Sequence, residues 1–141
     1  MKMNQKPSKL FSVSIVLLIL LGTLGAWSVV SAAQSVSNWT APEEAKEVEN
    51  IVEANADSIK KGKDTYGLAC AMCHGTEGAG DGPMSADMEP KPSVLSKDTI
   101  GNESDGELFW KISNGKAPMM SFEAMLPEED RWNVVNFIRT F

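Results

Sequence analysis

The sequence predicts an all-α domain with three main helices, preceded by an N-terminal hydrophobic helix. Three observations support this fold class. Residues that start and stop helices bracket three segments of the chain. No segment has the convincing alternation of apolar and polar residues that marks a β-strand, and no internal repeat is visible. The length of 141 residues suits one compact domain together with a targeting or anchoring segment.

The N-terminus has the layout of an export segment. Lys2, Lys6 and Lys9 precede a mostly apolar run over residues 10–33, which ends in small residues. This order is typical of a secretory signal peptide. The run is also about 24 residues long, and a helix needs only about 20 to cross a bilayer. A cleaved signal peptide and an uncleaved membrane anchor therefore both remain open, with a slight preference for the anchor.

Either interpretation exports the remainder of the chain, because the lysines stay on the cytoplasmic side. The expected location is the periplasm or the outer side of the cytoplasmic membrane, with membrane contact through residues 10–33 if they are uncleaved. The predicted organisation is an export segment over 1–33, a linker and lead-in over 34–55, and one domain over 56–141.

The exported part of the chain is acidic. Without residues 1–33 it has 10 basic and 19 acidic side chains, a net charge of −9. Such a balance argues against nucleic-acid binding. An acidic surface suits solubility and steering towards a partner with a positive docking face, although a solvated surface without a steering role fits equally well.

The first helix of the domain is expected over residues 56–71. Asn55 or Asp57 can cap its start. Tyr66 belongs to a face that is apolar or small, and Gly62 lies between the apolar positions of that face. A glycine there indicates either the close approach of a second helix or a kink.

The loop that follows is rich in glycine over residues 75–83, which allows the backbone to pass close to a flat cofactor or to form a tight surface loop. Residues 84–97 contain two prolines and no periodicity, so an extended chain is expected there.

Two further helices follow this loop. Ser104 and Glu107 fit a capping box at a helix start, and Gly115 fits a position just past the helix end. Pro127 then opens the last helix, where acidic residues in the first turn favour the positive end of the helix dipole.

The stretch Cys70-Ala71-Met72-Cys73-His74 carries the strongest chemical signal. A C-x-x-C-H run is typical of covalent attachment of a c-type haem. On a helical turn, residues at i, i+3 and i+4 share one face, so the two cysteines can each form a thioether and His74 can bind the iron. These are the only cysteines and the only histidine in the chain.

A disulfide, a thioredoxin-like motif and a zinc site each account less well for this stretch. A disulfide between Cys70 and Cys73 would close a very small loop and stabilise little. A thioredoxin-like motif needs a βαβ context, which is not visible nearby. A structural zinc site needs four Cys or His ligands, and the chain has three.

With these features, residues 56–141 resemble a class I cytochrome c. The resemblance rests on a helix ending in C-x-x-C-H, a glycine-rich loop, a middle helix, a methionine loop and a C-terminal helix. The methionine loop, residues 114–122, is similar to the family's N-G-K-x-x-M-P-x-F. The resemblance implies that Met119 is the second axial ligand. Met120 stands where the family usually has proline, so it is the alternative ligand.

The resemblance also implies how the helices pack. Gly62 and Tyr66 of the first helix are expected against Val134 and Phe137 of the last.

A further implied contact concerns the histidine ligand. The resemblance suggests that the carbonyl of Pro83 accepts the Nδ1 proton of His74. Such a bond would fix the ring and raise its basicity.

The implied function is single-electron transfer by one haem c, attached through Cys70 and Cys73 and ligated by His74 and Met119. Both axial positions would be filled, so we expect no catalytic residues and no enzyme activity of the chain alone. Soft thioether ligation favours reduced iron. The expected partners are a redox donor and acceptor of a bacterial respiratory or photosynthetic chain. The alternatives are a cytochrome subunit of an oxidoreductase complex and, with a weak methionine ligand, a haem-based sensor.

Overall fold

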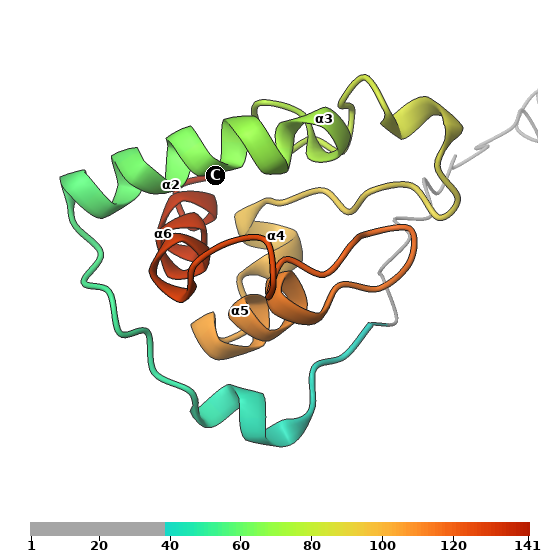
Figure 1. The fold of residues 1–141 in the computed structure, drawn as a ribbon. Coiled ribbons are helices and arrows are strands. Elements are labelled where there is room, and N and C mark those ends of the chain that lie inside the picture. The colour runs from blue at the N-terminus through green and yellow to red at the C-terminus, as the bar shows by residue number, and fades with distance from the viewer. Residues whose placement is uncertain (1–38) are drawn as a thin grey trace, which may run out of the picture. The chain divides into compact units, whose positions relative to one another are not determined.

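The computed structural model describes residues 39–141 (Figure 1). The predicted export segment at 1–33 and the first part of the predicted linker lie outside these residues. The described chain is helical, as expected, and has no strand apart from an isolated bridge between Lys116 and Met119. Its elements are η1 (Glu43–Glu47), α2 (Ala56–Ala69), α3 (Ala71–His74), η2 (Ser85–Asp87), α4 (Lys97–Ile100), α5 (Asp105–Asn114) and α6 (Glu128–Ile138). Between residues 39 and 141, no helix is long and apolar enough to cross a membrane.

Helix α2 begins where the sequence predicts. The side chain of Asn55 accepts hydrogen bonds from the backbone N–H groups of Asp57 and Ser58, both at 3.0 Å. Ser58 Oγ accepts the Asn55 N–H in return, which completes a capping box. The helix ends at Ala69, two residues earlier than expected, and Cys70 forms its C-cap before the short helix α3 begins.

The close contact between α2 and α6 depends on Gly62. A Cβ atom on Gly62 would lie 1.9 Å from the backbone oxygen of Asn133 and 2.9 Å from the Cβ of Phe137. The expected close approach of the last helix is therefore confirmed, as the crossing of α2 and α6 in Figure 1 illustrates. Tyr66 packs edge-on against Phe137, with ring centroids 5.2 Å apart. The atoms nearest to this position belong to the backbone of Asn133 and to the predicted Phe137, and Val134 is buried in the same core cluster as Tyr66.

Helix α5 has the predicted boundaries, and α6 starts at the predicted place, directly after Pro127. Ser104 Oγ accepts the N–H of Glu107, and the Glu107 carboxylate accepts the N–H of Ser104 at 2.7 Å. This reciprocal capping explains why Glu107 is buried at the start of α5. Gly115 ends the helix with a positive φ of 64°, a conformation that favours glycine. Pro127 precedes the first residue of α6.

The segment between the glycine-rich loop and α5 differs from the prediction in part. The sequence predicts an extended chain throughout residues 84–97, but Ser85–Asp87 form the 3₁₀ helix η2. The short helix α4 then starts after Ser96, which forms a capping box with Thr99. At α4, local hydrogen bonds of the Ser96 and Thr99 side chains stabilise a single turn without apolar periodicity, so the hydrophobic pattern does not reveal it.

Residues 39–55, which we name the strap, run along α5 before α2 begins. Ala41 and Ala45 of the strap are buried, with 5% and 3% of their surface exposed. The strap backbone lies against Gly106 of α5, where a Cβ atom would lie 2.0 Å from the oxygen of Ala45.

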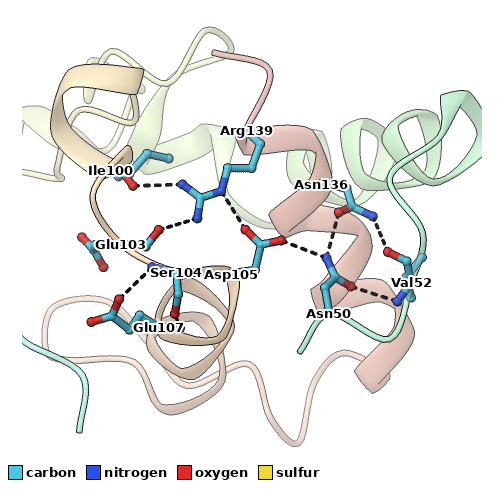
Figure 2. A network of polar contacts seen from close by, with 9 residues as sticks. All are labelled: Asn50, Val52, Ile100, Glu103, Ser104, Asp105, Glu107, Asn136 and Arg139. Atoms are coloured by element: carbon cyan, nitrogen blue, oxygen red, sulfur yellow. Dashed lines mark hydrogen bonds and ion pairs between the residues drawn. The ribbon is translucent and has the colours of Figure 1, made fainter. Parts of the chain in front are cut away.

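A polar network fixes the C-terminal end of α6 (Figure 2). Arg139 donates from Nε to Asp105 Oδ1 at 2.8 Å and from Nη1 to the carbonyl of Ile100 at 3.0 Å. It also donates from Nη2 to the carbonyl of Glu103. The planar guanidinium thus joins α6 to the start of α5 and to the turn before it.

The same network holds the strap (Figure 2). Asn50 donates to Asn136 Oδ1 at 2.8 Å and, at a longer 3.5 Å, to the Asp105 carboxylate. Asn136 donates in turn to the carbonyl of Val52 at 3.1 Å. Side chains of α5 and α6 therefore bind the strap at its C-terminal half.

Candidate functional site

A cavity of about 660 Å³ brings the predicted site residues together. Its volume lies within the range of about 300–1,000 Å³ that is usual for small-molecule and cofactor sites. The lining residues are mostly apolar and come from the strap, the end of α2, α3, the segments on either side of η2 and the methionine loop. They are Trp39, Ala69, Cys70, Met72, Cys73, His74, Met84, Met88, Pro90, Lys91, Pro92, Ser93, Lys116, Ala117, Pro118, Met119, Met120 and Phe122.

The two cysteines lie on the turn that begins α3. The N–H groups of Cys73 and His74 donate to the carbonyl of Cys70, at 3.1 and 2.9 Å. This turn presents all three side chains to the same cavity. Both cysteines are free thiols, so the structure contains no disulfide between them. Burial, together with the neighbouring Cys73, raises the pKa of Cys70 to about 12, which keeps this thiol protonated at neutral pH.

His74 is held through its Nδ1 atom, which lies 3.0 Å from the carbonyl oxygen of Ser93. The prediction that Pro83 supplies this acceptor is wrong. Because a carbonyl only accepts hydrogen bonds, the proton is placed on Nδ1 and the lone pair on Nε2. Burial lowers the pKa of His74 despite the opposing effect of the Ser93 hydrogen bond. The imidazole is therefore neutral at pH 7, which is the form that binds metals.

The glycine-rich loop explains why Ser93 occupies this position. The N–H of Leu95 donates to the carbonyl of Gly78 at 2.7 Å, which turns the chain back beside the loop. Gly80 has a φ of +74°, and a Cβ atom there would lie 2.6 Å from the oxygen of Pro92. The acceptor for His74 therefore depends on a contact between distant segments of the chain.

The methionine loop places both candidate ligands at the cavity. The N–H of Met119 donates to the carbonyl of Lys116 at 2.8 Å, which closes a tight turn. Met119 is partly buried and packs against the hydrophobic core. Met120 also lines the cavity, but 56% of its surface is exposed. Burial therefore favours Met119 over Met120 as a ligand.

The cavity differs in charge from the rest of the domain. Its lining contains no Asp or Glu, although residues 39–141 carry all 19 acidic side chains of the protein. Lys91 and Lys116 are its charged residues. Lys91 Nζ also donates to the carbonyls of Ser85 and Ala86, at 2.9 and 2.6 Å.

Trp39 is a lining residue that sequence reasoning did not assign. It comes from the strap, thirty-one positions before Cys70, and no motif marks it. Its ring lies 6.2 Å from the ring of Trp110, centroid to centroid, and Lys111 Nζ lies 5.7 Å from its centroid.

These residues fit a c-type haem. Two free thiols, a neutral imidazole and a thioether meet in one apolar cavity, which is the donor set that such a group requires. The two lysines offer positive charge to the carboxylates that a haem carries, and no acidic side chain of the lining opposes them.

The comparisons with known proteins agree with this fit. A family model described as cytochrome C oxidase, cbb3-type, subunit III matches residues 57–138. Among solved structures, the chain is similar to one titled as a Kuenenia stuttgartiensis reducing HAO-like protein complex, with 27% sequence identity and a TM-score of 0.58. The match covers 66% of this chain and 48% of the other, so the chain spans about half the length of that relative. No curated protein matches the chain.

Proposed function

Because the chain belongs to the cytochrome c family represented by the cbb3-type subunit III model, we propose that it is a single-electron carrier with one covalently bound haem c. In this proposal, Cys70 and Cys73 form the two thioether bonds, and His74 and Met119 are the axial ligands. Residues 56–141 form the haem domain. Residues 1–33 export the chain or anchor it to the outer side of the cytoplasmic membrane, and 34–55 lead into the domain.

The observation that carries the proposal is the convergence of Cys70, Cys73, His74 and Met119 on one cavity. The first three come from a single turn, but Met119 comes from a loop that follows another helix. A purely structural cysteine pair or a buried core histidine would not require the thioether of Met119 to line the same apolar cavity.

The side chains have separate roles in this function. The haem supplies a reversible one-electron change at its iron. Ser93 orients His74 and increases the basicity of its free nitrogen. Met119 would supply a soft thioether ligand, which favours the reduced state of a bound haem iron. If His74 and Met119 both bind the iron, no position would be left for a substrate on the metal, so we assign electron transfer and no catalysis to the chain itself.

Two findings favour a place within a larger complex as the second candidate function. The matching family is described as a subunit of an oxidase, and the similar solved structure is titled as a protein complex. In that case the same cavity would pass electrons to a permanent redox partner. In a free carrier, encounters with a donor and an acceptor of an electron-transfer chain are small and transient.

The test is to express the full chain in a host that attaches c-type haem outside its cytoplasm. We expect a denatured protein whose mass includes one haem, and a ferric spectrum with the weak long-wavelength band of iron–methionine coordination. Cys70→Ser and Cys73→Ser should each remove one attachment point. A protein that is exported intact but carries no haem would contradict the proposal. Size-exclusion chromatography of the native protein then separates a free carrier from a subunit.

A sensor function is tested with the same sample. Carbon monoxide should leave the spectrum of the reduced protein unchanged if Met119 occupies the sixth position. Rapid formation of a carbon monoxide complex would indicate an open axial site and would favour the sensor alternative.

A further inference from the structure

The strap contributes to the cavity although it precedes the matched family region. The family match begins at residue 57, and the strap ends at residue 55. Family membership therefore does not account for the position of Trp39.

The side chain of Trp39 packs against residues of α5. Its indole ring packs at an angle of 58° to the ring of Trp110. The amine of Lys111 lies over the Trp39 ring and pairs with the carboxylate of Glu103. Cation–π and tilted aromatic contacts of this kind favour a defined ring position. One strap residue is thus held on two side chains of a helix, next to the cavity.

Contacts of the remaining strap residues restrain Trp39 in its position at the cavity. The buried Ala41 and Ala45 follow directly, and the backbone around Ala45 lies against Gly106. Further along, Asn50 is bound by Asn136 and Asp105 (Figure 2). Beyond Trp39, the strap is therefore attached to α5 and α6 at two further places before α2 begins.

We infer that Trp39 is a wall of the haem cavity, and that the strap holds it there to keep water from the haem. This inference rests on the proposed haem site. It assigns a role in tuning the cofactor to a residue outside the matched family region.

The physical reason is the dielectric environment of the iron. Ferric His/Met haem carries one more positive charge than ferrous haem, and an apolar, water-poor cavity disfavours the more charged state. A large indole at the cavity should therefore raise the reduction potential. Removing it would admit water and lower the potential, while the ligands Cys70, Cys73, His74 and Met119 remain in place.

The experiment measures the midpoint potential of the haem-loaded full chain by spectroelectrochemical titration. Trp39→Ala should shift the potential to a more negative value, while the spectrum of His/Met coordination is retained. Trp39→Phe keeps an aromatic ring and should show a smaller shift. Ile51→Ala is the matched control, because Ile51 belongs to the strap, is 68% exposed and does not line the cavity. Its potential should equal that of the wild type.

A second variant tests the strap from its other end. Asn50 does not line the cavity, yet Asn50→Ala removes its bonds to Asn136 and Asp105 and should shift the potential in the same direction. The potential of Asn50→Ala still tests the inference if Trp39→Ala fails to fold. Equal potentials for wild type, Trp39→Ala and Asn50→Ala would overturn the inference and leave the proposed function intact. A wild-type protein without haem would instead overturn the proposed function.

Discussion

The Nδ1 atom of His74 lies 3.0 Å from the carbonyl oxygen of Ser93, a residue 19 positions further along the chain. This contact joins the turn that bears the cysteines to the segment after η2. Because the acceptor is a backbone group, no side-chain deletion removes it. The geometry of this segment instead depends on Gly80, whose backbone is close to Pro92.

Gly80→Ala should therefore loosen the support of His74. The residue has a positive φ, which costs a non-glycine residue about 1–2 kcal/mol, and the new Cβ would press on the Pro92 carbonyl. We expect a lower unfolding temperature of the haem-loaded protein and a lower stability of the iron–histidine bond to acid. Thermal and acid titrations followed by the haem spectrum measure both. Thr76→Ala, at an exposed position of the same loop, is the control, and equal behaviour of the two variants would contradict this role of Gly80.

The sixth ligand is decided by a pair of substitutions. Met119→Ala should abolish the long-wavelength band of the ferric protein and allow carbon monoxide to bind the reduced protein, because the partly buried thioether is lost. Met120→Ala removes a side chain that is 56% exposed and should preserve the band. The opposite pattern would assign the ligand to Met120.

His74→Ala should separate the covalent attachment of the haem from the coordination of its iron. The two thiols remain, so the mass of the variant should still include one haem. The low-spin spectrum should disappear, because the chain has no second histidine to replace the ligand. A normal low-spin spectrum of this variant would show that His74 does not bind the iron.

The two glycines of α2 offer a matched pair for stability. Gly62→Ala should destabilise the protein by about 1–3 kcal/mol, because the added methyl group meets the backbone of Asn133. Apart from its own stretch of helix backbone, Gly67 has no atom within 4 Å of the position of a Cβ, and Gly67→Ala should stabilise the helix by about 0.5–1 kcal/mol. Chemical denaturation of both variants measures the free energy of unfolding. Similar effects at the two positions would contradict the close helix contact.

The features that could be predicted from the sequence are those with local causes. Asn55 caps α2, the Ser104–Glu107 box opens α5 and Pro127 precedes α6, because each involves residues within one turn of a helix. Gly62 indicates a close helix contact for a similar reason. A glycine in an apolar helix face has no side chain, so another element can pack closely against the backbone there.

The features that could not be predicted depend on distant parts of the chain. Ser93 reaches His74 only because the segment around Leu95 folds back onto the glycine-rich loop, as the bond from Leu95 to Gly78 illustrates. Trp39 reaches the cavity through a strap whose seat is formed by α5 and α6. Neither contact leaves a spacing pattern in the sequence.

The contact between the strap and Gly106 has a consequence for how such chains diverge. A side chain at position 106 would meet the strap backbone at Ala45 and Val48, so glycine is needed there only while a strap is present. The two features should be inherited together. We expect homologues without such a strap to tolerate larger residues at this position, because the backbone that a side chain would meet is then missing.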